Sequence, residues 1–213
     1  ALYDVEYLTA DLGRMRSAGG GPDLQILYPH GAVRIADLVE VAIEINAMDL
    51  EPDGRIEIRR EDEMLFSEPL PGEKLMELIA IPATVRAKIR AGDELTVGYD
   101  SPSGNSTVTQ IRVVEDPLID RFAVIDRKLG MQPDLLRRHM KAQLFFDAEL
   151  YTAAFLAARD IAGINTGSAR GWYLQKKALE RMGIQSGRRS RELIGRFDAC
   201  DEEKQNLVNP GGN

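Results

Sequence analysis

The sequence predicts a multidomain α+β chain: an all-β antiparallel sandwich followed by an all-α domain of helical hairpins. Three observations predict this order. Between Leu24 and Val114, large apolar residues alternate with polar ones, as in strands with one buried face. From Leu118 onward, apolar residues recur at helical spacing. Glu115-Asp116-Pro117 separates the two patterns, because proline ends a strand and suits a first helical turn.

A chain of 213 residues is long enough for one large or two small domains, each with its own core. The N-terminal segment has an apolar pattern that fits either a short helix or an extended arm, and a Gly-Gly-Gly-Pro stretch tethers it to the next domain. The predicted parts are an arm and Gly-rich linker (1–22), a sandwich (23–116), a helical domain (117–198) and a polar tail (199–213).

Several bulk properties limit the environment in which the protein works. No apolar run approaches the roughly 20 residues that a membrane-spanning helix needs, so we expect no transmembrane segment. A single cysteine, Cys200, is compatible with either side of a membrane. The chain begins at Ala1 without Met. We expect that a signal peptide or a pro-segment was removed, or that the start reflects a cloning choice. We therefore expect an extracytoplasmic, periplasmic location rather than a cytoplasmic one.

Charge is divided unevenly along the chain. Residues 1–120 carry 11 Lys+Arg against 23 Asp+Glu, a balance of −12, whereas residues 121–213 carry 16 against 11, a balance of +5. This asymmetry indicates either a polarised partner surface or attraction between the two halves. Two ordinary solvated surfaces of different composition explain it equally well.

The clearest strands flank a predicted turn at Pro52-Asp53-Gly54. Val39 to Asn46 and Arg55 to Arg59 both alternate, which predicts a hairpin. We expect the apolar residues of this hairpin to share one buried face: Val39, Val41, Ile43, Ile45, Ile56 and Ile58. Further predicted strands are Leu24 to Tyr28, Met64 to Ser67, Leu75 to Ile81, Thr84 to Ile89, Glu94 to Tyr99 and Thr107 to Val114. Short strands at this spacing favour a two-sheet sandwich.

The opening stretch Leu24 to Gly31, the long strand Val39 to Asn46 and the late Ala91-Gly92-Asp93-Glu94-Leu95-Thr96-Val97 resemble a bacterial immunoglobulin-like domain over about residues 23–116. The chain lacks the Cys and Trp pattern of antibody domains, so no antibody-like site is carried over. The resemblance implies adhesion, spacing or assembly.

Helical spacing predicts a first helix from Leu118 to Leu129, and three more from Pro133 to Phe146, Glu149 to Ala162 and Ser168 to Met182. Gly183 is placed to end the last of these. A shorter helix is predicted from Ser190 to Phe197.

These helices resemble a tetratricopeptide-type repeat. A 34-residue unit that opens at Leu135 places Ala142, Phe145, Tyr151 and Ala154 at the small and aromatic positions of the family, and the next unit opens at Ala169, with Trp172 at its Trp position. Gln143, Ile161 and Thr166 depart from the usual pattern. The resemblance implies a helical scaffold that binds other proteins.

The sequence contains few motifs that carry chemistry. Asp49-Leu50-Glu51-Pro52-Asp53-Gly54 resembles the start of an EF-hand loop, but Arg60 occupies the position of the bidentate acid, so a solvated turn is the preferred interpretation. His30 and His139 fall in different predicted domains, and Cys200 has no histidine beside it in sequence. We therefore expect no catalytic residue, no metal and no cofactor.

The candidate site is instead a partner-binding surface. A basic cluster lies downstream of two aromatic residues, and the residues of this predicted surface are Trp172, Tyr173, Arg188, Arg189, Arg191 and Arg196. An acidic pI of about 5.0 argues against nucleic acid as the partner. We expect Arg188, Arg189 and Arg191 to face acidic groups, either on a neighbouring subunit or on this chain's own acidic half.

The preferred hypothesis is a non-catalytic accessory or scaffolding protein that docks onto a larger bacterial assembly, in solution or at a membrane, through protein–protein contacts. The alternative is a ligand-binding or hydrolytic domain whose site gathers scattered carboxylates, such as those of Asp93, Asp100 and Glu115.

Overall fold

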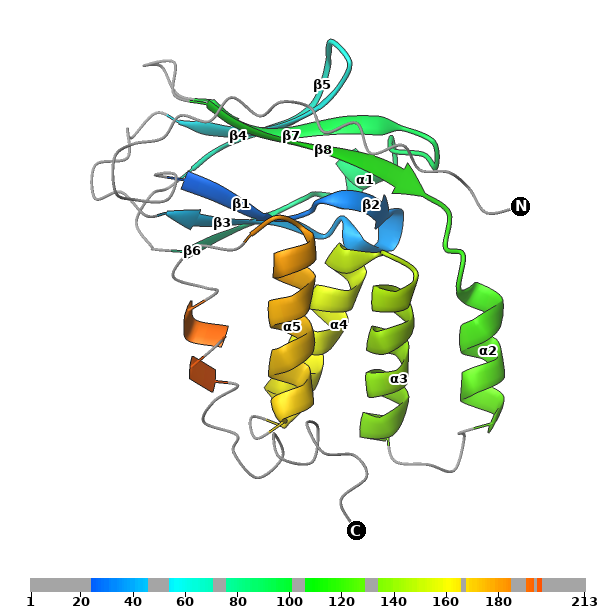
Figure 1. The fold of residues 1–213 in the computed structure, drawn as a ribbon. Helices are drawn as coiled ribbons and strands as arrows, with labels where there is room; N and C mark the ends of the chain where they lie inside the picture. Colours follow the sequence, from blue (N-terminus) through cyan, green and yellow to red (C-terminus); the bar gives the residue numbers. More distant parts are fainter. Residues whose placement is uncertain are drawn as a thin grey trace.

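The protein has three layers: a large sheet, a small sheet and a group of helices (Figure 1). The computed structural model describes residues 24–45, 54–70, 76–100, 106–128, 134–165, 168–184, 191–193 and 195–196. The small sheet lies between the large sheet and the helices, and the helices run away from it (Figure 1). The mixed α+β composition that the sequence predicts is confirmed.

The small sheet is antiparallel, with strand order β1-β3-β6. Its strands are β1 (Leu24–Tyr28), β3 (Glu40–Ile45) and β6 (Met76–Ala80). The large sheet has the order β2-β8-β7-β4-β5. Its strands are β2 (Gly31–Arg34), β4 (Arg55–Arg60), β5 (Glu63–Pro69), β7 (Glu94–Asp100) and β8 (Ser106–Val114). Because β2 runs parallel to β8, the large sheet is mixed rather than purely antiparallel.

The first core fills the space between the two sheets. Val41, Ile43 and Ile45 of β3 pack in one buried cluster with Ile56 and Ile58 of β4, as predicted. The same prediction was wrong for Val39, which precedes β3 and is 38% exposed. Leu38, which directly follows the short 3-10 helix η1 (Ile35–Asp37), is fully buried in that core instead.

The hairpin predicted from Val39 to Asn46 and Arg55 to Arg59, the segments that contain β3 and β4, was also wrong. β3 pairs with β1 and β6 in the small sheet, whereas β4 pairs with β5 and β7 in the large one. Alternation shows that each strand buries one face, but it does not show which strand lies beside it. The EF-hand-like string from Asp49 to Asp53 lies outside the described residues.

The predicted strand from Thr84 to Ile89 is a short helix, α1 (Ala83–Arg86). The carbonyl of Pro82 accepts hydrogen bonds from the backbone N–H groups of Val85 and Arg86, at 3.0 and 3.1 Å. Val85 is buried in the first core, so the apolar residue that suggested a strand is used by a helical turn.

The long helices lie close to their predicted positions. They are α2 (Ile119–Lys128), α3 (Asp134–Asp147), α4 (Tyr151–Ile164) and α5 (Ala169–Arg181). The Ser168 hydroxyl accepts a hydrogen bond from the Gly171 N–H and caps the start of α5. At its end, Gly183 has φ +83°, and the Ile184 N–H donates to the Leu179 carbonyl. This is a Schellman motif, and it ends α5 at the glycine that the sequence predicts as its stop.

The change from strand to helix falls where the sequence places it. Among the described residues, every strand ends by Val114, and the helices longer than four residues begin at Ile119 or later. None of the helices in the described ranges combines the length and hydrophobicity needed to cross a bilayer. The division into separate domains stays a prediction.

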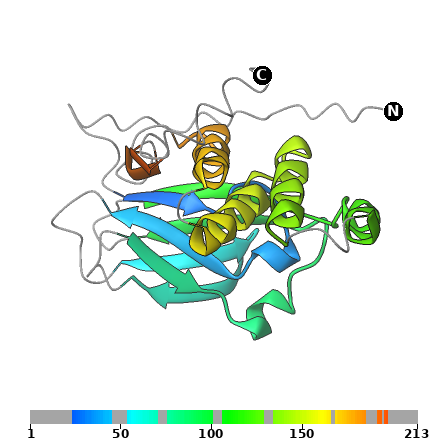
Figure 2. The same ribbon diagram turned by 90° about the horizontal axis from the view of Figure 1, so that it is seen from below.

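A second core joins the small sheet to the helices. It contains Leu27, Tyr28 and Ala42 from the sheet, together with Phe155 of α4 and Leu179 of α5 among others. α3, α4 and α5 pack on one another, and α2 stands at the outside of the group (Figures 1 and 2). The small sheet therefore covers one end of the group of helices.

Candidate protein-interaction surface

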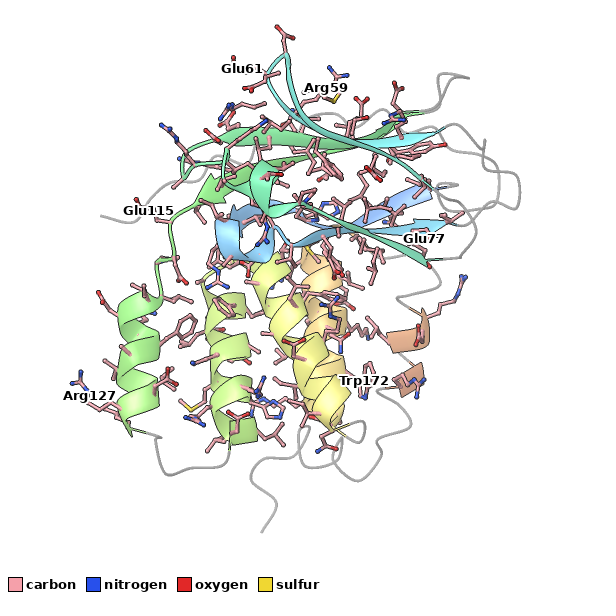
Figure 3. All side chains as sticks on the ribbon, turned by 180° about the vertical axis from the view of Figure 1, so that it is seen from behind. Arg59, Glu61, Glu77, Glu115, Arg127 and Trp172 are labelled. Atoms are coloured by element: carbon pink, nitrogen blue, oxygen red, sulfur yellow. The ribbon has the colours of Figure 1, made fainter. Side chains whose placement is uncertain are left out.

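The residues predicted to bind a partner lie on α5 and on the short segment that follows it. Tyr173 is 39% exposed, and the side chain of Trp172 is partly buried against the second core. Figure 3 shows Trp172 on the side of the bundle near residues 191–196. Arg191 and Arg196 are exposed, while Arg188 and Arg189 lie outside the described residues.

The short segment after α5 is anchored to the bundle. Leu193 is fully buried in the second core, and the guanidinium carbon of Arg196 lies 5.8 Å from the centre of the Trp172 ring. At this distance the cation interacts favourably with the face of the indole. The structure therefore brings together Trp172 and Arg196, which the sequence separates by more than twenty residues.

The solvent face of α5 is basic. Helical periodicity places its exposed and half-buried polar residues on one face, which also carries Tyr173. We call this face, with Trp172 and Arg196 at its rim, the α5 strip; its charged members are Arg170, Lys176, Lys177, Glu180, Arg181 and Arg196. Five of these six are cations, so the strip has an excess of positive charge. Of its cations, sequence reasoning found only Arg196.

Local contacts order part of this strip. Lys177 Nζ donates to Glu180 Oε2 at 2.8 Å, and Lys176 Nζ lies 3.7 Å from Glu180 Oε1. The hydrogen bond with Glu180 raises the pKa of Lys177, so the ammonium stays charged. Lys177 Nζ also lies 5.8 Å from the centre of the Tyr173 ring. Because Glu180 is shared by two lysines, it does not cancel the positive charge of the strip.

Three polar clusters join the two sheets to α3 and α4, the helices on which α5 packs. Sequence reasoning missed all three. In the first, Arg159 of α4 donates through Nη1 to the Tyr28 hydroxyl and to Glu40 Oε1, each at 2.7 Å. The Tyr28 hydroxyl in turn donates to Glu40 Oε1 at 2.7 Å. One carboxylate thus joins β1, β3 and α4.

The ionisation states in this first cluster follow from its surroundings. Burial and the hydrogen bond to Glu40 raise the pKa of Tyr28, so its hydroxyl remains a donor. Burial alone would raise the pKa of Glu40, but hydrogen bonds from Arg159 and Tyr28 outweigh it and the pKa is lowered. Glu40 is therefore a carboxylate with its charge compensated, which is a structural arrangement rather than a reactive one.

The second cluster surrounds Arg34 of β2. Its guanidinium binds Asp37 through two bonds, at 2.7 and 2.8 Å, and also binds Asp116. Its carbon lies 4.1 Å from the centre of the Phe145 ring in α3. Asp116 also accepts a hydrogen bond from the Leu118 N–H, so the linker into α2 is held at this point.

The third cluster surrounds His30, between β1 and β2. The imidazole Nε2 lies 2.7 Å from the Ile26 carbonyl, and Nδ1 lies 2.9 Å from the Thr109 hydroxyl of β8. The His30 backbone N–H donates to the Thr152 hydroxyl of α4, which donates back to the His30 carbonyl. Burial lowers the pKa of His30, so the ring is neutral at pH 7.

The carboxylates of the alternative hypothesis are not all gathered at one place. Asp93 precedes β7 and Asp100 ends it, so they lie at opposite ends of a seven-residue strand. Asp93 is already engaged by Arg60, at 3.0 Å, and by the Arg90 N–H. Glu115 follows β8, at the passage toward α2 (Figure 3). Within the described ranges, no group of three or more His, Cys, Asp or Glu side chains could hold a metal ion.

Comparison with known proteins adds no further assignment. No family model matches the chain, and no curated protein matches it significantly.

Proposed function

We propose that this chain is a non-catalytic accessory or scaffolding protein of bacteria that docks onto a larger assembly outside the cytoplasm, in solution or at a membrane. The observation that carries the proposal is the α5 strip: an exposed, basic surface with aromatic residues, held at a fixed position beside a sandwich. Its partner is an acidic protein surface. Electrostatic complementarity of this kind speeds association and selects the partner.

Rigidity supports this role. The three polar clusters and the second core connect sheet and helices through residues far apart in sequence, such as Tyr28 and Arg159. A scaffold gains affinity when its binding surface is ordered before the partner arrives, because less conformational freedom is lost on binding. The fixed α5 strip meets this condition.

The strand order supports an immunoglobulin-like sandwich as the spacer of this scaffold. If β2 is set aside and no strand is assigned to D, β1, β3 and β6 take the places of A, B and E in one sheet. β8, β7, β4 and β5 then take the places of G, F, C and C′ in the other. This is the division of strands found in immunoglobulin domains.

The helix bounds support a tetratricopeptide-like module. The 34-residue unit that opens at Leu135 contains nearly all of α3 and the whole of α4, which pack against each other, and the next unit opens at Ala169, the first residue of α5. Helix pairs of this length characterise the repeat, which commonly builds binding surfaces.

A matched pair of triple charge reversals tests the proposal. The test variant is R170E/R181E/R191E, which changes exposed residues of α5 and of the segment after it. The control is R121E/R127E/K128E, which makes the same charge change on exposed residues of α2. Figure 3 shows Arg127 on α2, at the opposite side of the bundle from Trp172. Circular dichroism confirms that both variants fold.

Each tagged protein is purified from the source cells at about 0.05 M and at about 0.5 M salt, since screening weakens exposed charge pairs. We expect the wild type and the control to retain an acidic partner at low salt and to lose it at high salt. The test variant should not retain it at either. Equal retention by the two variants, or a wild-type chain that carries no partner, would overturn the proposal.

A further inference from the structure

Among the strands that the structure describes, β6 is an edge of the small sheet, and none of them pairs with its outer side. In the order β1-β3-β6, this strand is the last, and β3 is its neighbour in the sheet. Figure 2 shows β6 at the margin of the molecule, on the side away from α5. Leu78, at its centre, is 47% exposed. An open edge offers backbone hydrogen-bonding groups to an added strand.

The register shows which backbone groups face outward. The Ile81 N–H donates to the Val39 carbonyl at 2.9 Å, so these two residues form a hydrogen-bonded pair. Hydrogen-bonded and non-bonded pairs alternate along an antiparallel ladder, and Leu78 is opposite Ala42 in a non-bonded pair. The N–H and C=O groups of Met76, Leu78 and Ala80 therefore point away from β3, toward the open side.

The edge of the large sheet differs from this one. β5 contains Glu63, Glu68 and Pro69, and its register with β4 shifts at a bulge. Charges, proline and bulges all hinder pairing with another chain. The sequence of β6, Met-Glu-Leu-Ile-Ala, has Glu77 as its one charge. Glu77 is 6% exposed in the single chain, so an added strand would impose little new desolvation on it.

The strand is complementary to itself. A two-fold axis at Leu78 sets Leu78 opposite its own copy, and Met76 opposite Ala80 of the second chain. All three pairs have their backbone groups outward, so each exchanges two hydrogen bonds. The pair at the axis also covers the two exposed Leu78 side chains with each other, since cross-strand neighbours lie about 5 Å apart.

We infer that two copies of this chain associate through antiparallel pairing of their β6 strands, which makes one continuous six-stranded sheet from the two small sheets. The inference does not rest on the proposed function, because β6 and the α5 strip are separate surfaces. Interfaces much smaller than about 1,200 Å² are transient, so the dimer is weak and reversible.

Sedimentation velocity over roughly 10 µM to 1 mM tests the association, since this range covers weak interfaces. The wild type should rise from the monomer mass of 23.6 kDa toward twice that value. L78K should stay monomeric because it places a charge at the two-fold axis. M64K is the matched control: Met64 is exposed to 41% on β5, and its substitution should leave dimerisation unchanged.

A disulfide tests the register. In a C200S background, which removes the chain's single cysteine, L78C should form an intermolecular disulfide on mild oxidation. The Cα atoms of a hydrogen-bonded pair lie about 5.5 Å apart, within the range that disulfides span. M64C in the same background should remain largely unlinked. A monomeric wild type, a dimer that L78K leaves intact, or equal crosslinking by L78C and M64C would overturn the inference.

Discussion

Arg159 Nη1 lies 2.7 Å from Glu40 Oε1, which joins helix α4 to strand β3 across 119 positions of sequence. The same nitrogen binds the Tyr28 hydroxyl. Together with the contacts of Arg34 and His30, this bond holds the helices in a fixed position against the two sheets.

R159M should lower the free energy of unfolding by about 1–2 kcal/mol, because Glu40 and Tyr28 lose their shared donor. The Arg159 side chain is 37% exposed, so solvent screening keeps the cost below that of a fully buried pair. Urea denaturation measures it. K177M removes a similarly exposed cation, at 38%, from a pair within α5, and should cost under about 0.5 kcal/mol. Equal costs would contradict a special role for the Arg159 contact.

Stability should fall as the pH drops below about 6.5 because of His30. Burial places the folded pKa of His30 below its ordinary value of 6.5. Its contribution is therefore complete above pH 6.5, and is lost as the pH falls through the folded pKa. The slope is at most about 1.4 kcal/mol per pH unit. The polar groups that face the imidazole are the Ile26 carbonyl and the Thr109 hydroxyl, and neither is charged.

Urea denaturation at a series of pH values compares H30Q with H139Q; the chain has only these two histidines. H30Q should flatten the stability profile below pH 6.5, whatever its absolute stability. H139Q should keep the wild-type slope. A slope that survives in H30Q would show that His30 is not the group that titrates.

G54A should destabilise the sandwich by about 2 kcal/mol or more. A Cβ at Gly54 would lie 2.1 Å from the Tyr99 hydroxyl oxygen and 2.2 Å from a carbon of its ring. Tyr99 is 4% exposed, so its ring cannot move aside without disturbing the first core. G98A is the control, because its nearest contacts are at 3.4 Å, and it should cost under about 1 kcal/mol. Thermal unfolding of both variants measures the two losses of stability, and equal losses would contradict the prediction.

G183A and G163A should change stability in opposite directions. Gly183 has φ +83° at the end of α5, where an L side chain is strained, so the substitution should cost about 1 kcal/mol. Gly163 lies within α4, and a Cβ there would meet no atom within 4 Å, so alanine should gain up to about 1 kcal/mol. Denaturant midpoints give both values. A loss of stability in G163A would contradict the helical assignment of that position.

Much of the fold follows from periodicity in the sequence. β1 has the predicted bounds, and α5 (Ala169–Arg181) lies within one residue of the predicted Ser168 to Met182, with Gly183 as its predicted stop. These elements depend on the spacing of apolar residues and on glycine at a helix end, and both can be read from neighbouring residues in the sequence. β2 was missed because it has only four residues, of which Val33 alone is buried, so its sequence shows no alternation of apolar and polar residues. Its parallel partner, β8, is also distant in sequence.

The site was predictable only in part. The sequence drew attention to Arg191, Arg196 and Trp172 because basic and aromatic residues cluster there. Lys176, Lys177 and Arg181 share the helical period of Tyr173, and a projection of α5 would have added them to the surface. The contacts of Tyr28 and His30 with α4 had no such signal, since hydrogen bonds between residues more than 120 positions apart leave no local pattern.

Hydrogen exchange of the complex with the acidic partner tests the central claim most directly. The partner recovered with the wild-type chain is purified and added back, and amide exchange is compared with that of the free protein. Binding at the α5 strip should slow exchange in α5 and in residues 191–196, and leave α2 unchanged. Protection confined to the sandwich or to α2, with none in α5, would contradict the account.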